Sequence, residues 1–98
     1  MNTRFVLQGI VFIWDDAKSR ANPVKHDDVT FEQAVEAFFD PFLILVDPSR
    51  HDETRNAIIG LDRNSHLLFV VHIELENEAI RIISARKATR SERNTYED

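Results

Sequence analysis

The stretch HLLFVVHIELENEAIRIISAR, residues 66–86, determines the fold class of this chain. Two runs rich in β-branched and apolar residues, His66 to Glu74 and Glu78 to Arg86, meet at the short polar joint Glu74-Leu75-Glu76-Asn77-Glu78. Such runs predict two strands joined by a tight antiparallel hairpin. Alternation places Leu67, Phe69, Val71 and Ile73 on one face, which we expect to contact the helices. The other face, with His66, Leu68, Val70, His72 and Glu74, could line a shallow cleft.

Two further strands are predicted immediately upstream, at Phe42 to Val46 and Arg55 to Leu61. The polar joint at 61–65 suits a second hairpin, whereas the longer joint at 47–54 is expected to be a mobile loop. Four consecutive strands with short connections predict an antiparallel meander.

The first part of the chain predicts one strand and two helices. Phe5 to Trp14 is rich in β-branched and aromatic residues and predicts a strand with a bulge or bend at Gly9. Asp15 can cap a first helix over Asp16 to Asn22, which Pro23 should end, because proline disfavours helical geometry at the residue before it.

A second helix is predicted to begin at Thr30. Thr30 and Gln33 have the spacing of a capping box, and an apolar stripe follows until Asp40-Pro41 ends the helix. The stripe consists of Phe31, Ala34, Val35 and Phe38.

Another capping-box spacing, Thr89 with Glu92, predicts a short C-terminal helix that includes Tyr96. The order of elements predicts an α+β fold: a largely antiparallel sheet, two helices after the first strand and a short C-terminal helix. With 98 residues, the chain should form a single domain spanning residues 1–98.

Composition excludes several classes of protein. The chain has no cysteine, so it can form neither disulfides nor thiolate metal sites. Its longest apolar runs fall far short of the roughly 20 residues of a membrane helix, and the N-terminus lacks a signal-peptide pattern, so we expect a cytoplasmic protein. A net charge of -5 disfavours whole-surface binding of nucleic acid.

Positive charge is nevertheless concentrated near the C-terminus, where five basic residues and one acidic residue lie between Arg81 and Arg93. Such a patch suits a polyanion or an acidic partner. Arg81 and Arg86 flank the apolar strand end, and the donor fork of arginine fits phosphate well. In an unbroken strand the two would point to opposite faces, so they could meet one phosphate only if the strand bends or ends before Arg86. Ion pairs with the many carboxylates are the simpler alternative.

The chain has no phosphate-binding glycine loop, HExxH helix or GxSxG elbow. Its cations and histidines would suffice for RNA cleavage without a metal, which needs a base, a cation beside the phosphate and an acid. Lys25 and His26 follow a predicted helix end and could converge on substrate, with His26 the proton-transfer group, or they could merely cap helix carbonyls. No histidine pair has a persuasive metal spacing.

The other candidates for chemistry are weaker. His72 lies within a strand and is a weaker candidate for catalysis than His26, whereas His51 and His66 are expected to be solvated. Tyr96 could stack on a base, donate a proton or simply pack against the sheet, and Glu92 is expected to act only as a cap partner.

In their order and spacing, several motifs resemble the BrnT-type toxins of bacterial type II toxin–antitoxin modules, small ribonucleases distantly similar to the RelE group. The most specific motif is Ile80-Arg81-Ile82-Ile83-Ser84-Ala85-Arg86-Lys87-Ala88-Thr89. The others are Trp14-Asp15 with Lys18 and Asn22, Lys25-His26, Phe31-Glu32-Gln33-Ala34, Phe39-Asp40-Pro41, Glu92-Arg93 and Tyr96-Glu97.

The resemblance implies a RelE-like fold, RNA cleavage that inhibits translation, and no cofactor. It implies neutralisation by a BrnA-like antitoxin, a basic ribbon-helix-helix DNA-binding protein, and leaves open a toxin homodimer within that complex. By family position, Lys25, His26, Arg81 and Arg86 are the candidate catalytic residues.

One departure from the family motif supports a second hypothesis. Where the family usually has Lys-His-Gly, this chain has Lys25-His26-Asp27-Asp28, and two carboxylates beside the candidate site would repel phosphate. The alternative is therefore a weakly active or inactive binding module that docks an antitoxin or another partner through its basic strand-end patch.

Overall fold

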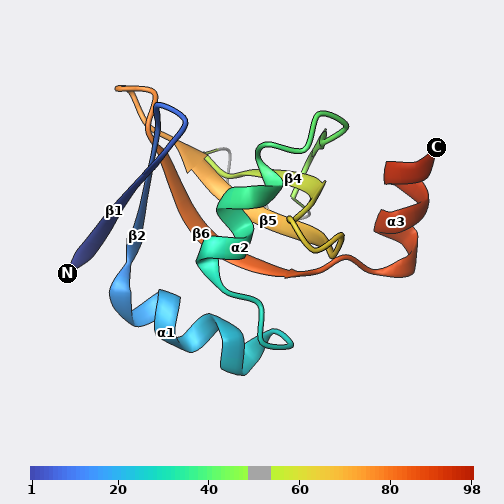
Figure 1. Ribbon diagram of the computed structural model, residues 1–98, viewed down its shortest axis with the longest axis horizontal. Coiled ribbons are helices and arrows are strands. Elements are labelled where there is room, and N and C mark those ends of the chain that lie inside the picture. The colour runs from blue at the N-terminus through green and yellow to red at the C-terminus, as the bar shows by residue number, and fades with distance from the viewer. Residues whose placement is uncertain (49–53) are drawn as a thin grey trace.

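A computed structural model describes residues 1–48 and 54–98, and it has the predicted α+β architecture (Figure 1). Within these residues, six strands form one sheet in the order β1-β2-β6-β5-β4-β3, and every neighbouring pair is antiparallel except β2 and β6. The strands are β1 (Asn2–Leu7), β2 (Ile10–Asp15), β3 (Ile44–Val46), β4 (Asn56–Leu61), β5 (Leu67–Glu74) and β6 (Ile80–Lys87). The antiparallel meander over β3 to β6 is confirmed. The predicted mobile loop at 47–54 concerns residues 49–53, which lie outside the described residues.

The N-terminal region corrects the prediction of one bent strand over Phe5 to Trp14. Two strands, β1 and β2, pair along their whole length and are joined by a turn at Gln8 and Gly9. Both turn residues have positive φ, 51° and 81° respectively, as a two-residue turn matched to strand twist requires. Gly9 therefore makes a hairpin turn rather than a bulge.

The first helix, α1 (Asp16–Lys25), passes through Pro23, so the predicted end at Asn22 was wrong. Asp15 caps its start as predicted, its carboxylate accepting a hydrogen bond from the Ala17 N–H at 2.8 Å. Pro23 lies in the last turn, where the N–H that it lacks removes only one helical bond. Tertiary hydrogen bonds of the Asn22 side chain hold this last turn in place.

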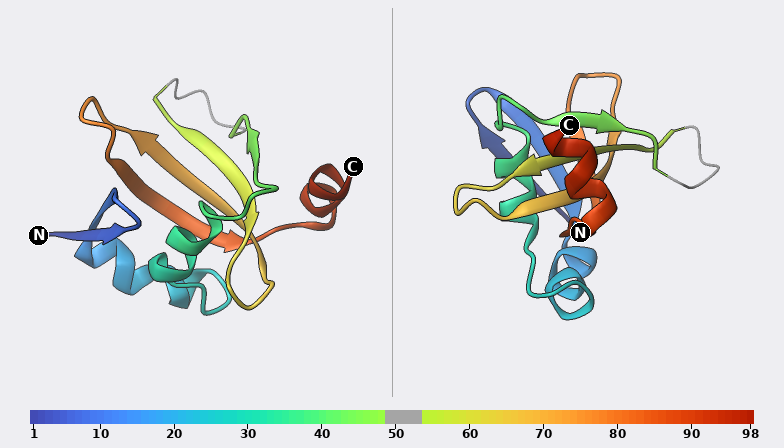
Figure 2. Two further views of the ribbon diagram at one scale, coloured as in Figure 1. Left: turned by 45° about the horizontal axis from the view of Figure 1, so that its top comes forward. Right: turned by 90° about the vertical axis from the view of Figure 1, so that its right-hand side faces the viewer.

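The other two helices begin with the predicted capping boxes. These are α2 (Phe31–Ala37), capped by Thr30 and Gln33, and α3 (Arg90–Glu97), capped by Thr89 and Glu92. Figure 1 shows α2 lying across one face of the sheet, and Figure 2 shows α3 on the side of the molecule away from the β1–β2 hairpin. No helix in the described part of the chain is long and apolar enough to span a membrane.

The face of β5 that contacts the helices is the reverse of the predicted one. Leu68, Val70 and His72 are buried, whereas Phe69 and Val71 are only partly buried. Both sets are largely apolar, so alternation identifies two faces without saying which one the helix covers. The sheet face away from α2 is called the open face below. The core on the α2 side consists mainly of Phe12, Trp14, Phe31, Val35, Ile58, Leu68, Val70 and Ile82.

Gly60 sets how closely α2 approaches the sheet. A Cβ atom at this position would lie 2.6 Å from the Ala37 carbonyl oxygen, which is backbone and cannot rotate away. We expect Gly60→Ala to lower the free energy of unfolding by about 1–3 kcal/mol, measured by urea denaturation, because the helix must shift outward.

Gly9→Ala is the matched control. Nothing lies within 4 Å of a Cβ there, although φ is +81°, so the cost should be confined to about 1 kcal/mol of backbone strain. Equal stability of Gly60→Ala and the unmodified chain would contradict this account of helix packing.

Candidate active site

An irregularity in the β5–β6 ladder brings Arg81 and Arg86 to the same face of the sheet. Val71 pairs with Ser84 but His72 pairs with Ile82, so Ile83 is an extra residue in β6. A β-bulge of this kind reverses the alternation beyond it. Arg81 is paired with Ile73 and Arg86 with Phe69, both on the open face. The opposite orientations expected for an unbroken strand therefore do not occur.

The Asn22 side chain connects α1 to the part of β6 that β2 does not pair with. Its side-chain oxygen accepts from the Ala85 N–H at 3.2 Å, and its Nδ2 donates to the Ala85 carbonyl at 2.7 Å. Nδ2 also donates to the Val29 carbonyl at 2.8 Å. The buried amide thus takes the place of a neighbouring strand and fixes the end of α1 beside β6.

Two adjoining cavities open along this junction. The larger has a volume of about 370 Å³ and is lined by residues of β5 and β6, the C-cap of α1, one residue after β3 and one before β4. These residues are His26, Pro48, Arg55, Phe69, Val71, Ile83, Ser84 and Arg86. The smaller, of about 300 Å³, lies against α1, where Lys18 and Lys25 line it. His26, Ile83 and Ser84 line both. We call these the larger and the smaller cavity.

Comparisons with known proteins point to one family. Residues 14–92 match the family model described as "Ribonuclease toxin, BrnT, of type II toxin-antitoxin system". The chain belongs to the BrnT family. A solved structure, the crystal structure of the ribonuclease toxin BrnT from Brucella abortus, is similar with a TM-score of 0.53 and 26% sequence identity, covering 79% of this chain and 94% of that one. A search of curated proteins gave no match.

Three of the four residues predicted from the BrnT motifs lie together. Lys25 is the last residue of α1 and His26 its C-cap, and His26 lines the larger cavity with Arg86. Arg81 lies apart from both cavities, although it shares the open face. Three residue pairs of the ladder separate it from Arg86, which corresponds to roughly 13 Å along the strand.

Arg86 is held firmly by its surroundings. Its two terminal nitrogens donate to the two carboxylate oxygens of Glu92, each at 2.8 Å. Its guanidinium carbon lies 4.3 Å from the centre of the Phe69 ring. The hydrogen bonds from Arg86 lower the pKa of Glu92 below its usual value, and those same bonds raise the pKa of Arg86. Glu92 therefore orients Arg86 in addition to capping α3 as predicted.

Sequence reasoning missed four residues of this junction: Asn22 as its anchor, and Arg55, Phe69 and Ser84 in the cavity lining. Asn22 and Ser84 lie within the BrnT motifs, which could have marked them. Alternation predicts Phe69 on the helix-facing side, because the alternation of β5 shows neither the bulge in β6 nor which face is buried. Arg55 directly precedes β4 and is distant in sequence from His26, so only the folded structure shows that they line the same cavity.

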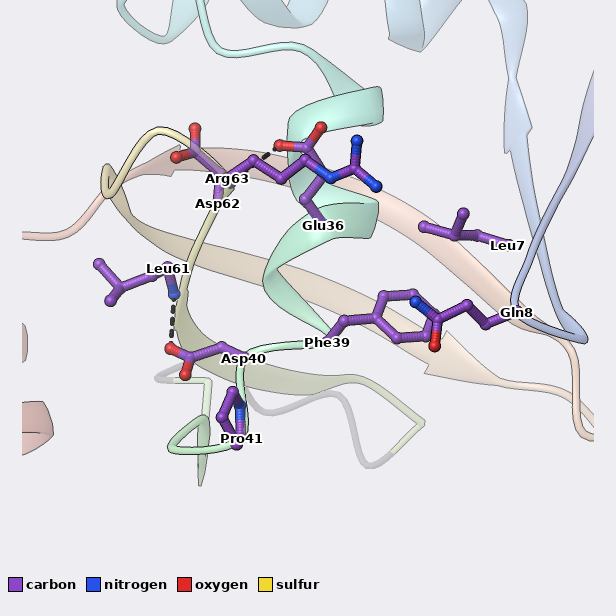
Figure 3. A pocket seen from close by; sticks show the side chains of 9 residues that line it. All are labelled: Leu7, Gln8, Glu36, Phe39, Asp40, Pro41, Leu61, Asp62 and Arg63. Carbon is purple, nitrogen blue, oxygen red and sulfur yellow. Dashed lines mark hydrogen bonds between the residues drawn. The ribbon is translucent and has the colours of Figure 1, made fainter.

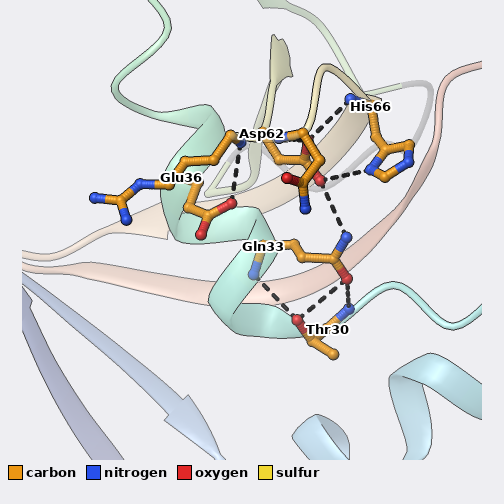
Figure 4. Close-up of polar contacts among 7 residues, drawn as sticks. Thr30, Gln33, Glu36, Asp62 and His66 are labelled. Carbon is orange, nitrogen blue, oxygen red and sulfur yellow. Dashed lines mark hydrogen bonds and ion pairs between the residues drawn. The ribbon is translucent and has the colours of Figure 1, made fainter.

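The weaker histidine candidates lie elsewhere. His72 is buried against Phe38 on the α2 side, with 4.9 Å between ring centres, and burial lowers its pKa. His66 is half-exposed and its Nδ1 lies 3.0 Å from the Asp62 carboxylate, which also accepts from Gln33 (Figure 4). His51 lies outside the described residues.

Tyr96 has a structural contact away from both cavities. Its hydroxyl donates to Asp40 at 2.6 Å, and burial together with this carboxylate raises the pKa of Tyr96 to about 12. Burial alone would raise the pKa of Asp40, but hydrogen bonds from Tyr96, Leu61 and Phe42 lower it below its usual value. This contact supports the packing alternative for Tyr96.

A third cavity, of about 330 Å³, lies between the β1–β2 turn, the end of α2 and the β4–β5 joint (Figure 3). Asp40 and Asp62 lie at its wall, and both carboxylates already accept several protein hydrogen bonds. Among the residues that the structure describes, no group of three or more histidine, aspartate or glutamate side chains could hold a metal ion.

The Asn22 amide should be essential to the stability of this junction. Asn22→Asp replaces the amide donor with oxygen, so the Val29 and Ala85 carbonyls lose their partner and face a negative charge. Since each lost buried hydrogen bond costs about 1–3 kcal/mol, we expect a loss of about 2–5 kcal/mol in urea unfolding.

Asn94→Asp makes the same chemical change at an exposed position of α3 and should alter stability by less than about 0.5 kcal/mol. Similar stabilities for the two variants would show that Asn22 does not hold the junction.

Proposed function

We propose that this chain is a toxin that cleaves RNA at the larger and smaller cavities, with no resident metal ion, and thereby inhibits translation. The observation that carries the proposal is the convergence of His26, Arg55, Ser84 and Arg86 on one 370 Å³ cavity, with Lys25 beside it. Membership of a family of ribonuclease toxins supports the type of reaction.

The chemistry follows from the needs of RNA cleavage. His26 takes the proton from a ribose 2′-hydroxyl, whose oxygen then attacks the adjacent phosphorus. Lys25 donates a proton to the departing 5′-oxygen as the P–O bond breaks, which leaves a cyclic phosphate and a free hydroxyl. Arg55 stabilises the charge that develops on the phosphate oxygens. Arg81, farther along the open face, contacts the RNA backbone.

A cleavage assay with purified protein tests the role of His26. We expect His26→Ala to reduce the rate of RNA cleavage by about 10²–10⁴-fold, the usual contribution of a positioned acid or base, while its circular dichroism stays unchanged. His66→Gln is the control, because His66 contacts Asp62 rather than either cavity. A fully active His26→Ala variant would reject this assignment.

We further propose that a BrnA-like ribbon-helix-helix antitoxin, encoded by an adjacent gene, neutralises the toxin by covering the basic open face. The net charge of -5 favours a basic partner, and Arg81 on the open face offers a local contact for an acidic side chain. Induced expression of this chain alone should arrest growth, and co-expression of the adjacent gene should restore it. Continued growth with abundant folded toxin would favour the binding-module alternative.

The binding-module alternative rests on the two carboxylates of Asp27 and Asp28. Both are exposed, follow His26 directly and have positive φ, 53° and 65°, a conformation that Asn tolerates as well as Asp. Removing two charges beside the cavity should strengthen the attraction of phosphate.

We therefore expect the double variant Asp27→Asn, Asp28→Asn to cleave RNA several-fold faster at low salt, with the gain shrinking as salt rises. The double variant Glu76→Gln, Glu78→Gln removes two charges from the β5–β6 joint, at the other end of β6 from Arg86, and should change the rate little. An equal gain in both variants would show a general effect of net charge.

A further inference from the structure

We propose that Arg86 and Phe69 together form a platform on which one nucleobase of single-stranded RNA stacks, inside the larger cavity. This inference rests on the proposed function and gives Arg86 a role other than that of phosphate ligand. The reason is that Glu92 and Phe69 already occupy parts of the Arg86 guanidinium.

The in-plane donors of Arg86 are largely engaged. Glu92 receives hydrogen bonds from both terminal nitrogens at 2.8 Å, and one of these nitrogens also donates to the Lys87 carbonyl at 3.2 Å. A phosphate that used this two-pronged edge would have to displace the Glu92 carboxylate, which leaves it only the narrower Nε side of the guanidinium.

The net charge of the Arg86–Glu92 pair also disfavours phosphate as its ligand. Arg86 and Glu92 are both ionised and lie in contact, so from the cavity the pair is nearly neutral. A phosphate in the cavity would gain little attraction from it, whereas a neutral base needs only a flat, polarisable surface.

The Arg86 side chain remains partly exposed in the larger cavity. Phe69 covers one side of the guanidinium at 4.3 Å, and Glu92 occupies the edge. The Arg86 side chain still has a relative exposure of 35% and lines the larger cavity. The side turned away from Phe69 is therefore the part that a ligand can meet, and an arginine plane is a well-suited stacking partner for an unpaired base.

The rest of the cavity suits a base and its sugar. Val71 and Ile83 provide apolar wall, while the Ser84 hydroxyl and the His26 ring provide polar groups. A base stacked on Arg86 would place its own ribose and phosphates toward His26 and Arg55, where the proposed chemistry occurs. The platform would thus position the RNA strand for cleavage, and Arg86 acts by contact with the base.

The test combines a substitution in the protein with removal of a base from the RNA. The probe is a 2′-O-methyl RNA oligonucleotide of about eight nucleotides, within the usual site size, which has no free 2′-hydroxyl and cannot be cleaved. A series of oligonucleotides carries one abasic position, moved along the strand. Affinity for each is measured by fluorescence anisotropy with the full chain and with Arg86→Lys, which keeps the charge but loses the plane.

If the platform exists, one abasic position weakens binding to the unmodified chain by about tenfold or more, as expected for loss of one stacked base. Arg86→Lys weakens binding to the intact oligonucleotide by a similar factor but leaves its affinity for that abasic oligonucleotide unchanged. Phe69→Leu, which retains the Arg86–Glu92 pair, should give the same pattern with a smaller loss. Arg81→Lys, on the same face but outside the cavity, should affect intact and abasic oligonucleotides equally.

If Arg86→Lys and the base deletion act independently at every position, the platform does not exist and Arg86 is a backbone contact. If the unmodified chain cleaves RNA but no abasic position affects its binding, the platform also fails while the ribonuclease proposal stands. If the unmodified chain neither binds the oligonucleotide nor cleaves RNA, the proposed function itself fails, and the platform fails with it.

Discussion

The side-chain amide of Asn22 is the interaction on which the candidate site depends. The sheet is incomplete beside the second half of β6, because β2 pairs with it only at Ile80 and Arg81 before the chain turns into α1. The backbone groups of Ala85 would otherwise lack partners at this buried point. One asparagine satisfies both groups, and it also holds the carbonyl of Val29 after the helix end. A single buried amide therefore sets the distance between the helix end that carries Lys25 and His26 and the strand that carries Arg86.

The bulge at Ile83 is the second constraint. Without the extra residue, the alternation of β6 would direct Arg81 and Arg86 to opposite faces, and one of them would point into the apolar core under α2. Burying an unpaired guanidinium there would be costly. Arg81 and Arg86 are an odd number of residues apart in an apolar strand, so a regular strand would place them on opposite faces. The bulge allows both to lie on the open face.

Sequence reasoning could predict those parts of the fold that depend on local signals. Both capping boxes, the four-strand meander and the C-terminal helix follow from residues that lie within a few positions of one another. The β1–β2 turn could not be distinguished from a bend, because Gly9 alone suits either and the pairing depends on contacts across the whole hairpin. The passage of α1 through Pro23 depends on Asn22 reaching Ala85, 63 residues away, and no local rule contains that contact.

In the candidate site too, local sequence identifies some residues, whereas their partners depend on contacts between distant parts of the chain. Lys25, His26 and Arg86 could be selected from the motif because each lies in a distinctive local setting, but the partners that define their chemistry come from elsewhere in the chain. Arg55 directly precedes β4, Phe69 lies on a face of β5 that alternation could not identify, and Glu92 belongs to the helix after the sheet.

Glu92 has the largest effect of these partners, because it occupies the hydrogen-bond donors of Arg86 that a ligand could otherwise use. An arginine whose donors are free can bind phosphate, whereas in Arg86 a carboxylate already occupies the end of the guanidinium and a ring covers one of its faces. The identity of a cationic residue in a motif therefore does not determine its role until the groups that occupy its hydrogen-bonding edge are known.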